Sequence, residues 1–161
     1  MSRWLHKMAW VVMAMYFFTL AYAAEDTPYG RADAANIEYA PHKVLYDVAV
    51  PDMATFVNVL DRVSYLNNVY QADPFAASIV LVLHGDEIPF FAIPNHDRHR
   101  ELMQRAESLT LSGPIEFRMC RIAAEAHGFE PGDIHGFVKV VPMADAEIVR
   151  LQQEEDYAYM R

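Results

Sequence analysis

The sequence predicts an α/β protein, an open sandwich in which a mainly parallel sheet carries helices on both faces. Two observations lead to this fold class. Short apolar or β-branched runs alternate along the chain with segments in which apolar residues recur every three or four positions. Pro, Gly and Asp separate the runs from these segments, as is typical of turns and helix starts. Strands that alternate with helices favour a parallel sheet.

The composition of the four predicted strands indicates different degrees of burial. "KVLYDVAV" is short and β-branched, whereas "ASIVLVLHG" is apolar almost throughout, which is typical of a central strand buried on both faces. "IEFRM" and "GFVKVV" complete the set. In chain order the predicted strands are residues 43–50, 77–85, 115–119 and 136–141.

Four helices are predicted between and after these strands. The first follows Asp52, a good N-cap residue, and its apolar positions recur at helical spacing up to Tyr70. "CRIAAEAH" is a short helix that Gly128 caps, and Asp145 can open the last helix. In chain order the predicted helices are residues 53–70, 97–108, 120–127 and 145–157.

The N-terminus has the three parts of an export signal. Arg3 and Lys7 form a positive region, residues 8–20 are apolar, and "AYA", ending at Ala23, is an A-x-A cleavage site. The sequence therefore predicts a signal peptide over residues 1–23 and a mature chain in the periplasm. The alternative is an uncleaved membrane anchor, but the apolar stretch is shorter than the ~20 residues that span a bilayer.

The mature chain divides into an arm and one domain. Residues 24–42 are polar and have no apolar period, which predicts a flexible arm, and residues 43–161 are long enough for one domain without disulfides. Loss of the signal peptide would lower the net charge from -9 to -11. Such an acidic surface repels phosphate backbones and anionic lipids. Nucleic acid is therefore not an expected partner, and a membrane is expected only with an uncleaved signal.

Cys120, the single cysteine, is the first candidate for a catalytic residue. With no internal partner it is a buried small hydrophobe, a link to another chain or a reactive thiol. It stands where a strand gives way to a helix, at the sheet edge where ligands bind in open α/β proteins. The helix N-terminus favours a thiolate, and Arg118 and Arg121 would add positive charge. His84 ends another strand and is the second candidate, either as acid, base or partner of the thiolate, or as a group that satisfies backbone atoms.

Other patterns give weaker hypotheses. "NHDRH" places His96 and His99 one helical turn apart, but spacing fixes no third metal ligand, so a solvated polar helix start is the favoured interpretation. A copper or zinc site of Cys120, Met119 and His84 is disfavoured because adjacent strand residues point to opposite faces. The chain has no GxGxxG, P-loop, GxSxG or HExxH motif. No cofactor and no metal are therefore expected.

The order of these features resembles that of the DsrE-like sulfur-relay family from about Lys43 to Arg161. The resemblance lies in "KVLYDVAV", "DMATFVNVLDRVSYLNN", "SIVLVLHGDEIPFFA", "IEFRMC" and "RLQQEEDYAYMR". Its most telling parts are the strand that ends in His84-Gly85, the lone Cys120 after a strand, and the closing "LQQEEDYAYM". The resemblance implies a Rossmann-like fold and a homo-oligomer, either a trimer or a hexamer. From the sulfur-relay members it also implies a persulfide on Cys120.

Two functional hypotheses follow. The first is a periplasmic sulfur carrier with sulfurtransferase-type activity, in which Cys120 accepts sulfane sulfur and passes it on by thiol exchange. Its partner would be a sulfur donor or acceptor protein or a small sulfane-sulfur compound, because export separates the chain from cytoplasmic relay partners and no second cysteine is present. The alternative is a non-catalytic binding or assembly subunit of the same fold, with a structural cysteine.

Overall fold

The computed structural model describes residues 27–111 and 113–161, and the predicted signal peptide, residues 1–23, lies outside this range. The chain divides into two compact units, residues 1–37 and 38–161. Among its described residues, the first unit contains no helix or strand. The elements described below all belong to the second unit. Every helix in the described part of the chain is too short or too polar to cross a bilayer.

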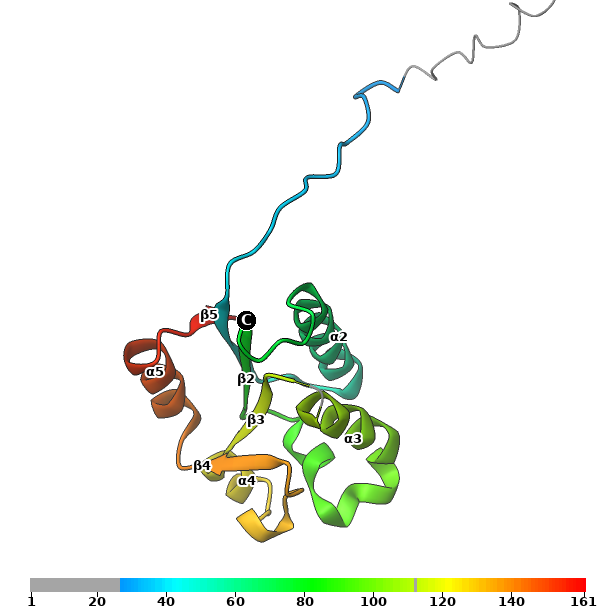
Figure 1. Ribbon diagram of the computed structural model, residues 1–161. Coiled ribbons are helices and arrows are strands. Elements are labelled where there is room, and N and C mark those ends of the chain that lie inside the picture. The colour runs from blue at the N-terminus through cyan, green and yellow to red at the C-terminus, as the bar shows by residue number, and fades with distance from the viewer. Residues whose placement is uncertain (1–26, 112) are drawn as a thin grey trace, which may run out of the picture. The chain divides into compact units, whose positions relative to one another are not determined.

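The centre of the second unit is a parallel β-sheet. The described residues form five strands in the order β4-β3-β2-β1-β5, and all four neighbouring pairs are parallel. This arrangement, shown in Figure 1, confirms the predicted α/β, Rossmann-like fold class. The strands are β1 (His42–Val48), β2 (Ala77–Leu83), β3 (Ile115–Cys120), β4 (Val138–Val141) and β5 (Ala158–Met160).

Helices cover both faces of this sheet. The α-helices are α2 (Met53–Val69), α3 (His96–Leu111), α4 (Arg121–Ala126) and α5 (Ala144–Glu154), and short 3-10 helices span Ile88–Phe91, Ile93–Asn95 and Pro131–Asp133. Figure 1 shows α5 on one side of the sheet and α2 and α3 on the other. The predicted N-cap of α2 is confirmed, because the Asp52 side chain accepts a hydrogen bond from the Thr55 backbone N–H at 2.8 Å.

The C-terminus differs from the sequence prediction. The last helix, predicted over 145–157, ends at Glu154, and the residues beyond it form β5 alongside β1. Asp156 has a φ of 59°, in the left-handed region, which turns the chain out of the helix. The Tyr157 backbone N–H then bonds to the Leu151 carbonyl at 3.1 Å. A strand of three residues is too short to show the alternation that identifies strands in a sequence.

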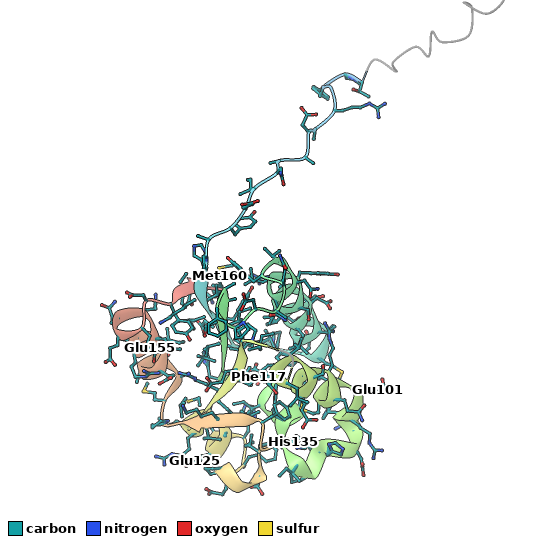
Figure 2. All side chains as sticks on the ribbon, viewed as in Figure 1. Glu101, Phe117, Glu125, His135, Glu155 and Met160 are labelled. Carbon is teal, nitrogen blue, oxygen red and sulfur yellow. The ribbon has the colours of Figure 1, made fainter. Side chains whose placement is uncertain are left out.

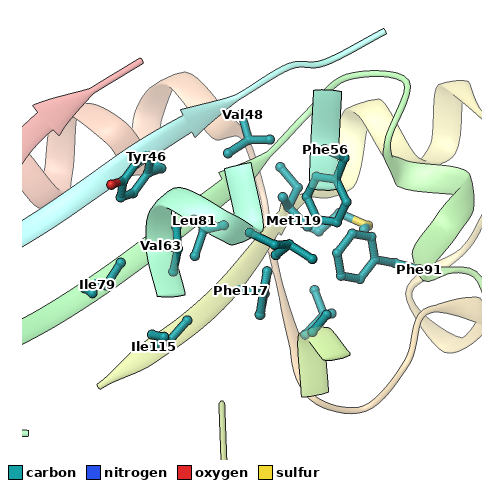
Figure 3. Close-up of a cluster of buried hydrophobic side chains, with 14 of the residues drawn as sticks. Tyr46, Val48, Phe56, Val63, Ile79, Leu81, Phe91, Ile115, Phe117 and Met119 are labelled. Carbon is teal, nitrogen blue, oxygen red and sulfur yellow. The ribbon is translucent and has the colours of Figure 1, made fainter. Parts of the chain in front are cut away.

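The sheet face toward α2 and α3 is a continuous apolar core. Figure 3 shows strand side chains such as Leu81 and Met119 packed against Phe56, Val63 and Phe91. Phe91 is fully buried, and its ring lies 5.4 Å from that of Phe56, measured between centroids, in an edge-on arrangement. Full burial of one such side chain contributes about 1.5–3 kcal/mol.

The face toward α5 combines a smaller apolar cluster with buried ion pairs. The Arg118 side chain is 8% exposed and donates hydrogen bonds to Glu116, at 2.9 and 3.0 Å, and to Glu147 of α5. Arg150 also donates to Glu147. The hydrogen bonds from Arg150, together with those from Arg118, lower the pKa of Glu147 to about 2 despite its burial. The cluster consists of Leu45, Val80, Val82, Cys120, Ala144, Ile148, Leu151 and Tyr157.

Candidate functional site

Three neighbouring strands end side by side at the carboxyl edge of the sheet. Val48 of β1 pairs with Leu83 of β2, and Leu83 in turn pairs with Met119 of β3. One residue further along, His84 and Cys120 therefore stand at the same level on adjacent strands. This edge is where open parallel α/β sheets bind ligands. The fold thus brings together the two residues that the sequence analysis selected.

The side chains of these residues divide between the two faces of the sheet. Met119 belongs to the apolar core beneath α2 and α3, whereas Cys120 belongs to the cluster beneath α5. The expected opposite orientation of these two neighbours is confirmed. A metal ion held jointly by Met119 and Cys120 is therefore ruled out by geometry.

His84 lies on the same face as Cys120 and is held by a carboxylate. Its Nε2 atom lies 2.6 Å from Oδ1 of Asp47 on β1, and its backbone N–H donates to the Val48 carbonyl at 3.0 Å. The side chains of His84 and Asp47 are 26% and 20% exposed. The bond to Asp47 occupies Nε2 and leaves Nδ1 for another partner. Asp47, His84 and Cys120 thus follow one another across β1, β2 and β3.

Asp47 has a second partner in Tyr159 of β5, whose hydroxyl donates to Oδ2. Burial raises the pKa of Asp47, but the hydrogen bonds from Tyr159 and His84 outweigh burial and hold this pKa below its usual value. The same hydrogen bond raises the pKa of Tyr159. Asp47 is therefore a carboxylate at neutral pH, suited to orienting the imidazole. Neither Asp47 nor Tyr159 is among the site residues predicted from the sequence.

A buried glutamate ties together the loops that follow β1 and β2. The Glu87 carboxylate accepts from the Gly85 backbone N–H at 2.8 Å and from the Val50 N–H at 2.9 Å. A Cβ atom on Gly85 would lie only 2.6 Å from Cα of Ala49, so the approach of the loops requires glycine. The segment from His84 to Glu87 therefore fixes the sheet edge beside the imidazole.

The surroundings of Cys120 differ from those predicted. The residue is a free cysteine, 5% exposed, and it stands at the N-cap of α4. Arg118 lies on the same face but is engaged by two carboxylates, one of them Glu147. Arg121 points to Glu125, with 3.5 Å between Nε and Oε1. The prediction that these arginines add positive charge at the thiol is wrong, because nearby carboxylates balance both charges.

The two histidines of "NHDRH" do not share one face. His99 is buried, and its ring centroid lies 4.9 Å from that of Phe90, so the predicted solvated helix start is wrong for this residue. Burial, followed by the charge of Arg98, lowers the pKa of His99. His96 instead faces His135, with 5.2 Å between the ring centroids. The sequence could not reveal this pair, because His135 lies far along the chain in the loop before β4.

Comparisons with known proteins add evidence on the fold. No family model matches this chain, and no curated protein matches it. The structure of the protein of unknown function MTH1491 from Methanobacterium thermoautotrophicum is similar, with a TM-score of 0.62 and 21% sequence identity. The match covers 74% of this chain and 98% of MTH1491. It shows a shared fold. At this identity the likeness says nothing about substrate or partner.

Proposed function

We propose that this protein carries sulfane sulfur as a persulfide on Cys120, with His84 as proton acceptor and Asp47 as the group that orients His84. The observation that carries the proposal is the order of the three residues on one face of β3, β2 and β1. A carboxylate binds the His84 imidazole at Nε2, and the thiol stands at the end of the next strand. An oriented imidazole within reach of a thiol is the arrangement that activates a nucleophilic cysteine. We place the mature protein in the periplasm, as the N-terminal sequence predicts.

The proposed transfer needs no oxidant. His84 takes the proton of the Cys120 thiol, and the thiolate attacks the outer sulfur of a donor persulfide, R–S–SH. A bond forms between Sγ and this sulfur while the donor's S–S bond breaks. The leaving R–S⁻ takes the proton from the imidazole, so the products are the Cys120 persulfide and R–SH. Transfer to an acceptor thiol is the reverse reaction with a different R group.

The burial of Cys120 restricts what can react with it. The thiol is 5% exposed and lies under α5 and at the start of α4. α4 has six residues, and its Ile122 is 55% exposed. A short helix with few buried residues opens more easily than a long packed one. We therefore expect the donor to be a small sulfane-sulfur compound, or a protein that displaces α4 as it docks.

The same burial favours one alternative, a non-catalytic assembly subunit in which Cys120 only fills space. A free buried cysteine commonly behaves as a small hydrophobe, and Cys120 contacts an apolar cluster that includes Val82 and Ile148. Both functions are compatible with a homo-oligomer, since within the described part of the chain β4 and β5 each have an edge that pairs with no other strand. Light scattering tests this assembly, and a mass of one chain at micromolar concentration would contradict it.

Persulfide formation separates the two functions. The folded protein is incubated with inorganic polysulfide and its intact mass is followed over time. We expect a gain of one sulfur, about 32 Da, that is absent in Cys120→Ser. His84→Gln should slow the gain about 10²-fold. The matched control is His42→Gln, at the opposite end of β1, which should leave the rate unchanged. No adduct on the folded wild-type protein would leave the assembly function standing.

A further inference from the structure

A pair of imidazoles lies on the other side of the sheet from His84. His96 is the first residue of α3, and His135 lies in the loop before β4, on the side that carries α3 (Figure 2). Their ring planes make an angle of 73°. A bridge between Ala92 and Ile134, and a 3.1 Å hydrogen bond from the His135 backbone N–H to the Phe91 carbonyl, hold the two segments together. These backbone contacts fix the positions of the two histidines relative to each other.

Each of these two histidines has a buried nitrogen that lacks a partner. Within the described residues, Nδ1 of His96 and Nε2 of His135 are shielded from solvent and make no hydrogen bond. Leaving such a buried polar atom unpaired destabilises the folded protein, so it requires an explanation. Both residues line one cavity of about 320 Å³, together with Met103, Gln104, Glu107, Gly136 and Phe137.

We propose that this cavity binds a divalent transition-metal ion, Cu²⁺ or Zn²⁺, through His96 and His135. Two imidazoles on one tetrahedral ion, each with a metal–nitrogen distance of about 2.0–2.1 Å, place their ring centroids about 5 Å apart. The observed separation is 5.2 Å. Imidazole nitrogen is a preferred ligand of both ions, and Cu²⁺ binds the more tightly of the two.

The remaining coordination positions are open. No three His, Cys, Asp or Glu side chains among residues 27–111 and 113–161 are grouped to hold a metal ion, so water or a small ligand completes the shell. Glu107 lines the cavity and supplies negative charge. Phe137 lies parallel to the His135 ring, at 6.0 Å and 11°, and limits its rotation. Phe137 packs against the core on the α3 face, so this site is separate from Cys120.

Calorimetric titration of the untagged chain tests the proposal. Cys120→Ser protein serves as the background, so that the thiol cannot bind the ion. We expect one equivalent of Cu²⁺ or Zn²⁺ to bind and Mg²⁺ not to bind. His96→Gln and His135→Gln should each weaken binding at least tenfold, whereas the control His99→Gln should have no effect. Unchanged affinity in both variants, or an equal loss in the control, would overturn the proposal.

A measurement on the wild-type chain locates the ion without relying on variants that must fold. Substoichiometric Cu²⁺ broadens the NMR signals of amides close to the bound ion. We expect the signals of Gly136 and Phe137 to disappear first. Broadening centred instead on Gly85, next to His84, or spread evenly over the chain, would contradict a site at His96 and His135.

Discussion

The two faces of the sheet differ in what covers them. Toward α2 and α3, β2 and β3 present apolar side chains only, and fully buried rings such as Phe56 and Phe117 fill the space. Toward α5, the strands present Asp47, Arg118 and Cys120 beside the apolar residues, and the 11-residue helix α5 packs on this face. The first face accounts for most of the packing. The second face holds partly exposed ionisable groups at the edge of the sheet.

The two faces therefore differ in what they contribute: the face toward α2 and α3 contributes mainly stability, and the face toward α5 holds the ionisable groups of the candidate site. An apolar face contributes through burial and packing alone. A face with a histidine held by a carboxylate keeps groups that can exchange protons, and these groups require hydrogen bonds that the apolar face does not. Substitutions on the two faces should therefore have different effects on stability and on proton exchange, and the substitutions below test this expectation.

The largest loss of stability is expected on the apolar face. Phe117 is fully buried, and its ring lies 5.7 Å from that of Phe91. Phe117→Ala should lower the free energy of unfolding by about 3–5 kcal/mol, because it removes a buried ring and leaves a cavity. Denaturant titration measures this loss. Cys120→Ala removes one sulfur atom and should cost about 1 kcal/mol or less. Equal losses would indicate a purely structural cysteine.

The next effect is the pH dependence of the α5 face. The pKa of Glu147 falls from 4.5 to about 2 on folding, so its contribution to stability is present above pH 4.5 and is lost as the pH falls toward 2. Unfolding measured at several pH values should show a loss of about 1–3 kcal/mol over this range. Glu147→Gln should be less stable at pH 7 and lose less on acidification. Parallel curves for both proteins would contradict this account.

One added methyl group tests the close approach between the backbones of Gly85 and Ala49 at the sheet edge. Gly85→Ala would place a Cβ atom 2.6 Å from Cα of Ala49, so we expect a loss of about 1–3 kcal/mol. Gly132→Ala is the control, because nothing lies within 4 Å of the added atom, and it should change stability by less than about 0.5 kcal/mol. Thermal unfolding compares the two. Similar shifts would show that the loops can move apart.

The smallest effect concerns the tyrosine that supports Asp47. Tyr159→Phe removes one hydrogen bond and should cost about 1 kcal/mol or less, since Tyr159 is partly exposed. It should also raise the pKa of Asp47, because the lost bond favours the carboxylate. NMR titration of the Asp47 carboxyl carbon measures this change. An unaltered titration would mean that the hydroxyl does not support the site.

Most of the fold was predictable from the sequence because its signals are local. The buried run of β2 and the helical spacing of α2 each lie within one continuous stretch. β5 was missed because three residues carry no pattern, and with it the role of Tyr159 was missed. Asp156 adopts a left-handed conformation just after α5. Because it is not a glycine, the sequence does not indicate that the chain turns there.

The candidate site was predictable only in part. His84 directly follows β2 and Cys120 is the last residue of β3, so the topology of a parallel sheet places both at one edge. Asp47 has no such marker, since its bond to His84 depends on the register between β1 and β2. The carboxylates that bind Arg118 are those of Glu116 on β3 and Glu147 on α5. The contact with Glu147 depends on how α5 packs against the sheet, which the sequence pattern does not reveal.

If His84, oriented by Asp47, activates Cys120, as proposed, then loss of either residue should slow the alkylation of this thiol. The folded wild-type protein, His84→Gln and Asp47→Asn are treated with iodoacetamide at pH 7, and labelling of Cys120 is followed by mass. We expect the wild-type protein to react fastest, Asp47→Asn about tenfold more slowly and His84→Gln about 10²-fold more slowly. Equal rates in all three proteins, each limited by unfolding, would contradict the claim.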